Sequence, residues 1–282
     1  MKKLLFFLLA SNCIFAQTDT EIFLYKLTAS NTVNSTSGKN ISNNIGYDSQ
    51  PHFYSKKEIV FSSNRKEYTD IAKYDMESAT KSYLNKTPYG GEYSPQRIPG
   101  SKNISAVRLD NNGLQRLYEY NIESGKSKEI IADLKVAYPF WYAKNNIIHV
   151  SIVGDDLDLM ITDLNTSKHT TIQKKVGRSL HRIPNSELVS YVSKTNDTWS
   201  IKSLNPKTGE TKLIIYTIGK TEDVCLLPNG TLLIAYGSKI MKYHPKTAAR
   251  WTLFHDFTKN KHKNISRITV NASGTLLALV SE

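Results

Sequence analysis

Short apolar runs of strand length recur along this chain at an almost constant spacing. In the copy at residues 50–86, an apolar run at 58–61 is followed by the alternating segment 70–75 and by a further short run at 81–84. Apolar runs and apolar/polar alternation over four to eight residues, bounded by turn residues, predict β-strands. Because a fixed long period marks a repeat architecture, we interpret the chain as copies of one four-stranded unit.

Six copies align on the residue that we expect to open the innermost strand of each unit. The steps between the aligned residues are 44, 44, 41, 44 and 44. The aligned residues are Phe53, Arg97, Trp141, Arg182, Leu226 and Val270. The sequence therefore predicts an all-β fold, a six-bladed β-propeller of four-stranded antiparallel blades.

The last copy is divided between the two ends of the chain. Its second strand, at residues 276–280, is followed only by two more residues, whereas the third-strand pattern appears at 21–26 and a fourth strand is expected at 32–37. N-terminal strands that complete the C-terminal blade would close the ring and leave no long unpaired sheet edge. We expect one propeller domain over residues 17–282, and a monomer.

Residues 1–16 have the pattern of a secretory signal peptide. Two lysines precede an apolar run at residues 4–10, and Ala16 supplies a small residue at the cleavage point. The run is shorter than the roughly 20 residues that span a bilayer. Lipidation at Cys13 is disfavoured, because Asn12 stands where lipoprotein signals carry a small residue. We expect an exported protein, periplasmic or secreted, with no transmembrane segment in the mature chain.

Cleavage at that point leaves Cys225 as the only cysteine of the mature chain. A lone thiol forms no intramolecular disulfide, so the stability of the fold must come from its core. We expect Cys225 to be buried beside an inner strand and unreactive.

Four motifs of the first full copy carry a resemblance to a known repeat. They are Pro51-x-Phe53, Ser62-Ser-Asn-Arg65, Asp70-Ile-Ala-Lys-Tyr-Asp75 and Thr80-Lys81. Together they resemble the TolB-like, or PD40-type (WD40-like), six-bladed propeller repeat, over roughly residues 21–282. The resemblance implies the fold but no single function, because such propellers serve as scaffolds, binding domains and parts of enzymes. TolB carries an additional N-terminal α/β domain, so its partnership with a peptidoglycan-associated lipoprotein is not implied here.

Motifs for catalysis or cofactor binding are missing from the sequence. It has no Gly-x-Ser-x-Gly elbow, no His-Glu-x-x-His pattern, no Cys-x-x-Cys pair and no phosphate-binding glycine loop. The acidic run at 154–158 lacks the rest of an EF-hand loop, so we expect a hairpin turn there. We expect no cofactor, with calcium as the alternative.

Geometry offers better candidates than motifs do. In a propeller, the residues around the start of each inner strand face the central channel, so separated segments converge there. The candidate ligand-binding residues at this channel mouth are Gln50, His52, Glu92, Tyr93, Tyr138, Arg178, His181, Glu222, Asp223 and Arg267. The two arginines can make bidentate contacts to a carboxylate or phosphate.

Three functions stay open on this basis. The first is a non-catalytic module that binds a protein or cell-envelope component through its loops. The second is a metal-dependent hydrolase, similar to a lactonase, with Glu222, Asp223 and His181 as ligands in the channel. The third is a small-ligand sensor or carrier that uses Arg178 and Arg267. The alternative to all three is a hydrated channel without a ligand, in which the charged side chains only pair with one another.

The net charge adds a weaker indication. It is +12 for the whole chain and +10 without Lys2 and Lys3. A basic exported protein is attracted to anionic surfaces such as lipid head groups, polysaccharides or acidic partners. Nucleic acid is not expected as a partner in that compartment, and lysines spread over many turns are more typical of a solvated surface.

Overall fold

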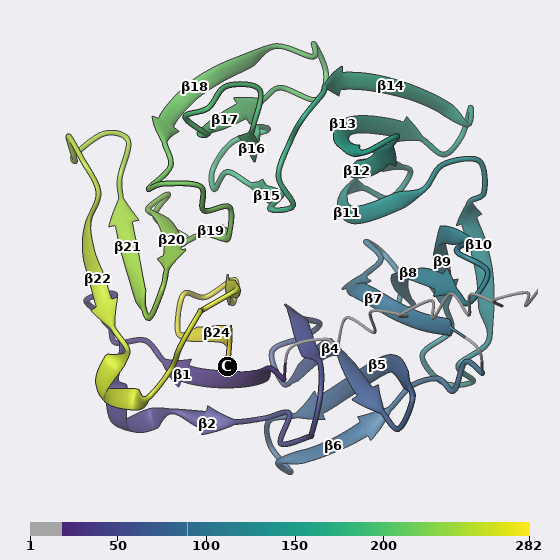
Figure 1. The fold of residues 1–282 in the computed structure, drawn as a ribbon, viewed down its shortest axis with the longest axis horizontal. Coiled ribbons are helices and arrows are strands. Elements are labelled where there is room, and N and C mark those ends of the chain that lie inside the picture. The colour runs from purple at the N-terminus through teal and green to yellow at the C-terminus, as the bar shows by residue number, and fades with distance from the viewer. Residues whose placement is uncertain (1–18, 89) are drawn as a thin grey trace, which may run out of the picture.

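The computed structural model describes residues 19–88 and 90–282, which form a ring of β-sheets around a central axis (Figure 1). The expected signal peptide lies outside the described residues. Two short 3-10 turns, η1 (Ser35–Ser37) and η2 (Thr258–Asn260), are the only helical elements of the described part. None of its helices is long and apolar enough to cross a membrane. The predicted all-β fold is confirmed.

The ring is built from 24 strands. In chain order they are β1 (Glu21–Lys26), β2 (Lys39–Asn40), β3 (Asp48–Phe53), β4 (Glu58–Arg65), β5 (Tyr68–Asp75), β6 (Thr80–Tyr83), β7 (Gly90–Arg97), β8 (Ile104–Asp110), β9 (Gln115–Tyr120), β10 (Ser127–Ile131), β11 (Val136–Ala143), β12 (Asn146–Val153), β13 (Asp156–Asp163), β14 (Lys168–Gln173), β15 (His181–Arg182), β16 (Val189–Ser193), β17 (Ser200–Leu204), β18 (Thr211–Tyr216), β19 (Val224–Leu226), β20 (Leu232–Tyr236), β21 (Lys239–Tyr243), β22 (Thr252–Asp256), β23 (Arg267–Val270) and β24 (Leu276–Ser281).

Antiparallel four-stranded groups make up the ring. Three sheets follow the chain directly, as β11 to β14, β15 to β18 and β19 to β22. An eight-stranded sheet contains two antiparallel halves, β3 to β6 and β7 to β10, which join through one parallel pair, Thr69 with Gly91. The expected propeller arrangement of antiparallel four-stranded sheets is confirmed.

The remaining sheet joins the two ends of the chain. The strand order of this sheet is β2-β1-β24-β23. Strand β1 pairs with β24 from Glu21 opposite Ser281 to Lys26 opposite Leu276. N-terminal strands therefore complete the C-terminal sheet, as the divided last copy indicates. The fourth strand was wrongly placed at residues 32–37, because it is Lys39–Asn40. Asn34 instead accepts a hydrogen bond from the Thr36 amide and caps η1, a local bond that competes with sheet pairing.

The residue that aligns the copies does not open the inner strand. Phe53, Arg97, Arg182, Leu226 and Val270 are the last residues of their strands, and Trp141 lies two residues before the end of β11. The polar segments ahead of them are strands because they pair with a buried second strand, which outweighs their weak β-propensity. Proline is tolerated in β3, β7 and β11, since an innermost strand is a sheet edge.

The core lies between neighbouring sheets. At the ring closure, Ile22 and Val280 pack with Ile59 and Phe61 of the following sheet, and all four are fully buried. Cys225 belongs to another such cluster, and burial raises the pKa of its thiol. The thiol therefore stays protonated at neutral pH, as expected for an unreactive cysteine.

Ile22→Ala tests how much the ring depends on its closing strand. Removing this buried side chain from β1 is expected to lower the free energy of unfolding by about 2–5 kcal/mol, because a cavity remains between two sheets. Chemical denaturation measures the change. The matched control is Ile45→Ala, at a side chain that is 90% exposed, with an expected change below about 0.5 kcal/mol. Equal effects of the two substitutions would contradict this assignment of the core.

Candidate functional site

A cavity of about 310 Å³ lies where the inner strands meet. Each inner strand presents equivalent positions of the repeat to it. The residues three positions before the aligned residue all line it: Gln50, Ser94, Tyr138, Ser179, Asp223 and Arg267. The next residues of each copy do so as well: Pro51, Pro95, Pro139, Leu180, Val224 and Ile268. The cavity is therefore the central channel of the propeller.

Seven of the ten predicted site residues line this channel. They are Gln50, His52, Tyr138, Arg178, His181, Asp223 and Arg267. Glu92, Tyr93 and Glu222 are not among the residues that line this cavity. Ser94 and Gln96 belong to a segment that the repeat places at the channel but are not among the ten candidates, and Phe140 lies outside the expected segments. Ser94 is the repeat equivalent of Gln50, and the other two are equivalents of His52. Applying the 44-residue period to Gln50 and His52 identifies all three positions.

Backbone bulges explain which side chains turn inward. The pairing register shifts between Ser49 and His52 and again between Tyr93 and Gln96. Within the bulges, Gln50 and Ser94 adopt left-handed φ angles of 58° and 51°. A bulge re-aims the side chains that follow it, so the alternation expected for a regular strand does not hold here.

Glu92 serves the fold rather than the channel. Its carboxylate is fully buried and accepts hydrogen bonds from Asn85 Nδ2 (2.7 Å), Thr87 Oγ1 (2.5 Å) and Tyr120 OH (2.9 Å). Burial raises the pKa of Glu92 above its ordinary value. The neighbouring Tyr93 packs near Tyr47, with 6.1 Å between the ring centroids. Both residues thus hold adjacent parts of the ring together.

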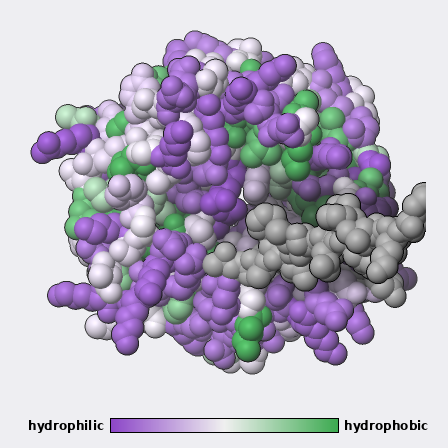
Figure 2. Space-filling view, in the orientation of Figure 1, coloured by the Kyte–Doolittle hydropathy of each residue, from purple (hydrophilic) through white to green (hydrophobic). Residues whose placement is uncertain are grey.

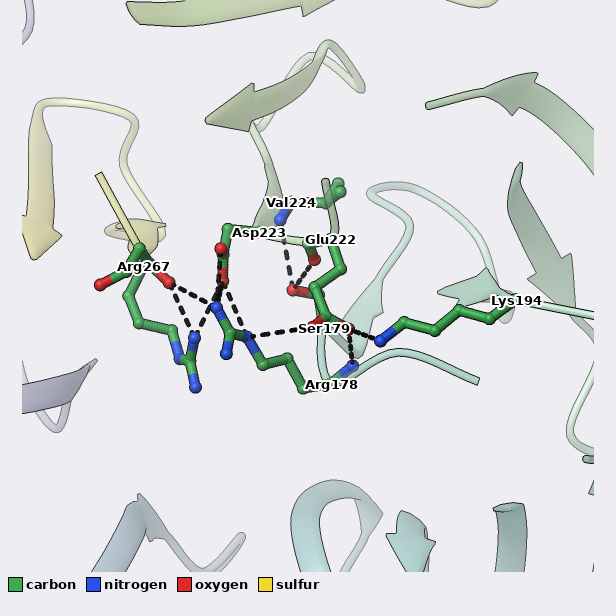
Figure 3. Close-up of polar contacts among 8 residues, drawn as sticks. Arg178, Ser179, Lys194, Glu222, Asp223, Val224 and Arg267 are labelled. Carbon is green, nitrogen blue, oxygen red and sulfur yellow. Dashed lines mark hydrogen bonds and ion pairs between the residues drawn. The ribbon is translucent and has the colours of Figure 1, made fainter. Parts of the chain in front are cut away.

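Asp223 is the centre of a charged cluster on one side of the channel (Figure 3). Arg178 Nη2 donates to Asp223 Oδ2 at 2.8 Å and to Oδ1 at 2.9 Å, and Arg267 Nη1 donates to Oδ1 at 3.0 Å. Both guanidinium groups also donate to the Ser266 carbonyl. Asp223 lies just before β19, Arg178 before β15 and Arg267 at the start of β23. One carboxylate thus joins three sheets.

Glu222 holds the same cluster in place, although it does not line the cavity. Its Oε2 atom accepts hydrogen bonds from the Arg178 amide at 3.1 Å and from Lys194 Nζ at 2.7 Å. The Ser179 hydroxyl donates to the Glu222 carbonyl at 2.6 Å and accepts from the Val224 amide at 3.2 Å. These bonds hold the backbone that carries Arg178 in place.

Some hydrogen-bond donors of the cluster are not used within it. It contains three cationic side chains, Arg178, Arg267 and Lys194, against the two carboxylates of Glu222 and Asp223, so its net charge is +1. Arg178 Nη1 and the Nε and Nη2 atoms of Arg267 take no part in the hydrogen bonds that build it (Figure 3). Because arginine stays protonated, these donors give the channel wall the properties of an anion site.

The rest of the channel wall combines apolar side chains with polar ones and with a further cation, Arg97. Tyr138, Phe140, Trp141, Pro95 and Pro139 line it opposite or beside the arginines. Arg267 lies 6.0 Å above the ring of Tyr138. A wall with few charged groups and several rings favours ligands that combine one anionic group with an apolar or planar part.

Two neutral histidines complete the lining. Burial lowers the pKa of His52 to about 4, and the nearby His181 and Arg97 act in the same direction. Burial likewise lowers the pKa of His181 to about 4. At neutral pH both imidazoles are uncharged and add hydrogen-bonding capacity without adding charge.

Glu222, Asp223 and His181 do not assemble as metal ligands. The two carboxylates are bound by arginine and lysine side chains, which a cation would have to displace. Within residues 19–88 and 90–282, no three His, Cys, Asp or Glu side chains are placed to hold a metal ion together. The donor set therefore suits an anion better than a cation.

The channel histidines predict how stability depends on pH. Between about pH 6.5 and pH 4 they bind protons in the unfolded chain but not in the folded protein, so the free energy of unfolding falls as the pH is lowered. His181→Gln is expected to make this fall shallower by up to roughly 3 kcal/mol. Denaturation at a series of pH values measures it, with His244→Gln at an outer turn as control. Parallel curves for the wild type and His181→Gln would contradict the neutral state of His181.

Comparisons with known proteins agree on the fold alone. No family model and no curated protein sequence matches this chain. Among solved structures, a putative TolB from Agrobacterium tumefaciens is similar over 93% of this chain and 98% of its own, with 9% identity and a TM-score of 0.70.

Two further structures show that the fold occurs with different functions. TolB from Acinetobacter baumannii is 11% identical over 95% of this chain and 64% of its own, with a TM-score of 0.60. An oligogalacturonate lyase in complex with manganese is 9% identical over 91% of this chain and 82% of its own, with a TM-score of 0.60. The chain thus has the propeller fold that TolB proteins share with other propellers, as the repeat motifs predict.

Proposed function

We propose that this protein is an exported, non-catalytic propeller that binds a protein or cell-envelope component, and that its channel receives a carboxylate of that ligand. The observation that carries the proposal is the pair Arg178 and Arg267, which both line the channel cavity and keep N–H groups outside their hydrogen bonds to Asp223. Arginine pairs with carboxylates through two parallel hydrogen bonds, which gives both affinity and orientation.

The balance of charge supports a single carboxylate. The cluster carries one positive charge in excess, so a monoanion neutralises it without leaving a buried charge unpaired. The cavity, about 310 Å³, is at the lower end of the range of ligand pockets. It therefore suits a small acid or the carboxylate end of a larger chain, with its apolar part against Tyr138 and Phe140.

A metal-dependent enzyme is the less favoured alternative. Its three expected ligands include Asp223, which two arginines already bind, and Glu222, which lies outside the channel lining. A sensor or carrier of a small acid differs from the leading proposal only in the size of the ligand, and it would use the same two arginines.

The proposal also includes the number of blades, the export of the protein and its oligomeric state. Counting the two halves of the eight-stranded sheet separately gives six blades, since only the pair Thr69 and Gly91 joins them. The lysines and apolar run ahead of Ala16 support export, and we expect the mature protein to be a monomer.

Arg267→Gln tests the anion site. Short peptides ending in an aromatic residue with a free carboxylate are expected to bind, and the same peptides with an amidated end are not. The substitution is expected to weaken binding by about 10-fold to 100-fold, as expected when a hydrogen bond to a charged group is lost. Isothermal titration calorimetry measures the affinities.

The matched control for this experiment is Arg182→Gln. Arg182 is exposed, stacks on Tyr142 at 4.5 Å and does not line the cavity, so its loss should leave binding unchanged. Melting curves verify that both variants fold. Equal affinity for free and amidated peptides, or unchanged binding by Arg267→Gln, would refute the proposed carboxylate site.

Chelation separates the binding function from the metal-dependent alternative. With Glu222 and Asp223 committed to lysine and arginine, the melting temperature is expected to be the same with and without a chelator, and after addition of calcium or manganese. Differential scanning fluorimetry together with elemental analysis checks this. One tightly bound divalent ion per chain, with a melt that falls on chelation, would favour the enzyme instead.

A further inference from the structure

Two kinds of connection lie on the same face of the ring. Because the four strands of each sheet are antiparallel, the turn from the second to the third strand and the linker from the fourth strand to the next sheet emerge together. We call this side the linker face. The turns from first to second and from third to fourth strands form the opposite face.

Exposed apolar side chains concentrate on the linker face. Eight large hydrophobic residues among those described are at least about one-third exposed. Six of them lie at or near the end of a second strand, in the turn to a third strand, or where a linker starts or runs: Ile45, Leu109, Leu114, Val153, Tyr216 and Tyr236. The other two, Leu213 and Leu253, lie within the outer strands β18 and β22, and none of the eight lies in a turn of the opposite face.

Three consecutive linkers of this face carry exposed lysines. They follow β14, β18 and β22, and their lysines outside any ion pair of the described residues are Lys174, Lys220, Lys259, Lys261 and Lys263. The acids of these linkers, Glu222 and Asp223, are turned toward Arg178, Lys194 and Arg267 instead. Exposed acids of the same face lie in the second-to-third-strand turns, where Asp156 pairs with Lys175 and Asp155 and Asp197 remain. Five lysines against these two acids leave this face of the three sheets with an excess charge of +3.

The same half of the chain holds almost all of the net charge. Residues 166–282 contain 18 Lys and Arg against 7 Asp and Glu, which is +11 of the total of +12. The sheets of residues 19–165 are close to neutral by comparison. One sector of the ring is thus strongly cationic, and the face seen in Figure 2 mixes hydrophilic residues with smaller apolar groups.

A groove of about 770 Å³ opens among these lysines. Its lining offers the Ser238 and Thr258 hydroxyls, the Lys261 and Lys263 ammonium groups and the Asn264 side chain. Glu282 also borders it, and its Oε2 atom accepts a hydrogen bond from Asn264 Nδ2 at 2.8 Å. The Ser238 and Thr258 hydroxyls bond to each other, and the Thr258 hydroxyl donates to Asp256 Oδ1. The donors of this groove that suit the oxygens of a phosphate head group are therefore the Lys261 and Lys263 ammonium groups.

We infer that the linker face of the sheets β11 to β14, β15 to β18 and β19 to β22 docks on an anionic lipid bilayer. Each of these sheets presents one half-exposed apolar or aromatic side chain, namely Val153 (50%), Tyr216 (53%) or Tyr236 (50%), beside lysines of its own linker. Lysines attract anionic head groups, and tyrosine is favoured at the interface between water and lipid.

A lipid surface fits better than an acidic polysaccharide. Aliphatic side chains such as Val153 gain free energy when they enter the boundary between head groups and acyl chains, and a hydrated polysaccharide offers no such region. The inference is independent of the carboxylate site. The lining of the channel continues through Arg97 and Pro99 toward the opposite face, so a docked ring keeps its channel accessible.

Vesicle flotation tests the docking face with the purified mature protein. The wild type is expected to bind vesicles of phosphatidylcholine with about 30% phosphatidylglycerol, and to bind pure phosphatidylcholine at least tenfold more weakly. The variant Lys220→Ala/Lys259→Ala/Lys261→Ala is expected to lose at least tenfold in partition coefficient, since each lysine near an anionic surface contributes about a factor of five or more. Tyr236→Ser should weaken the binding that persists at high salt.

The matched control is Lys126→Ala/Lys144→Ala/Lys246→Ala, which removes the same charge from exposed lysines in turns of the opposite face. Its partition coefficient should change by less than about twofold if position, not net charge, decides binding. Equal losses in the two triple variants would overturn the inference. So would equal binding to neutral and anionic vesicles, or no binding to either.

Discussion

The closure of the ring is the constraint on which the rest of this structure depends. Strand β1 pairs with β24 along its whole length, so the first described strand and the last belong to one sheet. A closed ring holds the inner strands of all sheets around one axis, where equivalent residues of every sheet line one cavity. The channel is thus a consequence of topology. The residues at the inward-facing positions of the repeat determine the chemistry of its lining.

The residues at those inward-facing positions differ in chemistry from one copy of the repeat to the next. Proline at the same position of three copies keeps a rigid wall, whereas Asp223 and Arg267 introduce charge at equivalents of Gln50. A carboxylate between two arginines is costly to desolvate, and it is tolerated because every oxygen has donors and because Glu222 and Lys194 balance the outside of the cluster. Both arginines line the cavity and keep unused donors, so we interpret the cluster as a binding site and not only as a structural contact.

The sequence predicts the fold well because the evidence for it is periodic. Six copies of one strand pattern, with a divided last copy, specify a closed ring without knowledge of any contact. The site is predicted less well, because single side chains depend on local backbone geometry. Glu92 and Tyr93 precede the bulge of β7 and do not line the cavity, whereas Gln96 follows it and does, and no pattern in the sequence marks a left-handed serine. Likewise, Lys194 lies in a distant turn, so its ion pair with Glu222 could not be foreseen.

The central claim is that Arg178 and Arg267 present a carboxylate site to the channel. A crystal structure of the mature protein with 4-bromobenzoate tests it most directly, since the anomalous signal of bromine locates the ligand and its orientation. The account predicts one bromine in the channel near Tyr138 and Phe140, with the carboxylate on Arg178 Nη1 and Arg267 Nη2. A channel that contains only water at saturating ligand, or a ligand whose carboxylate points away from both arginines, would contradict it.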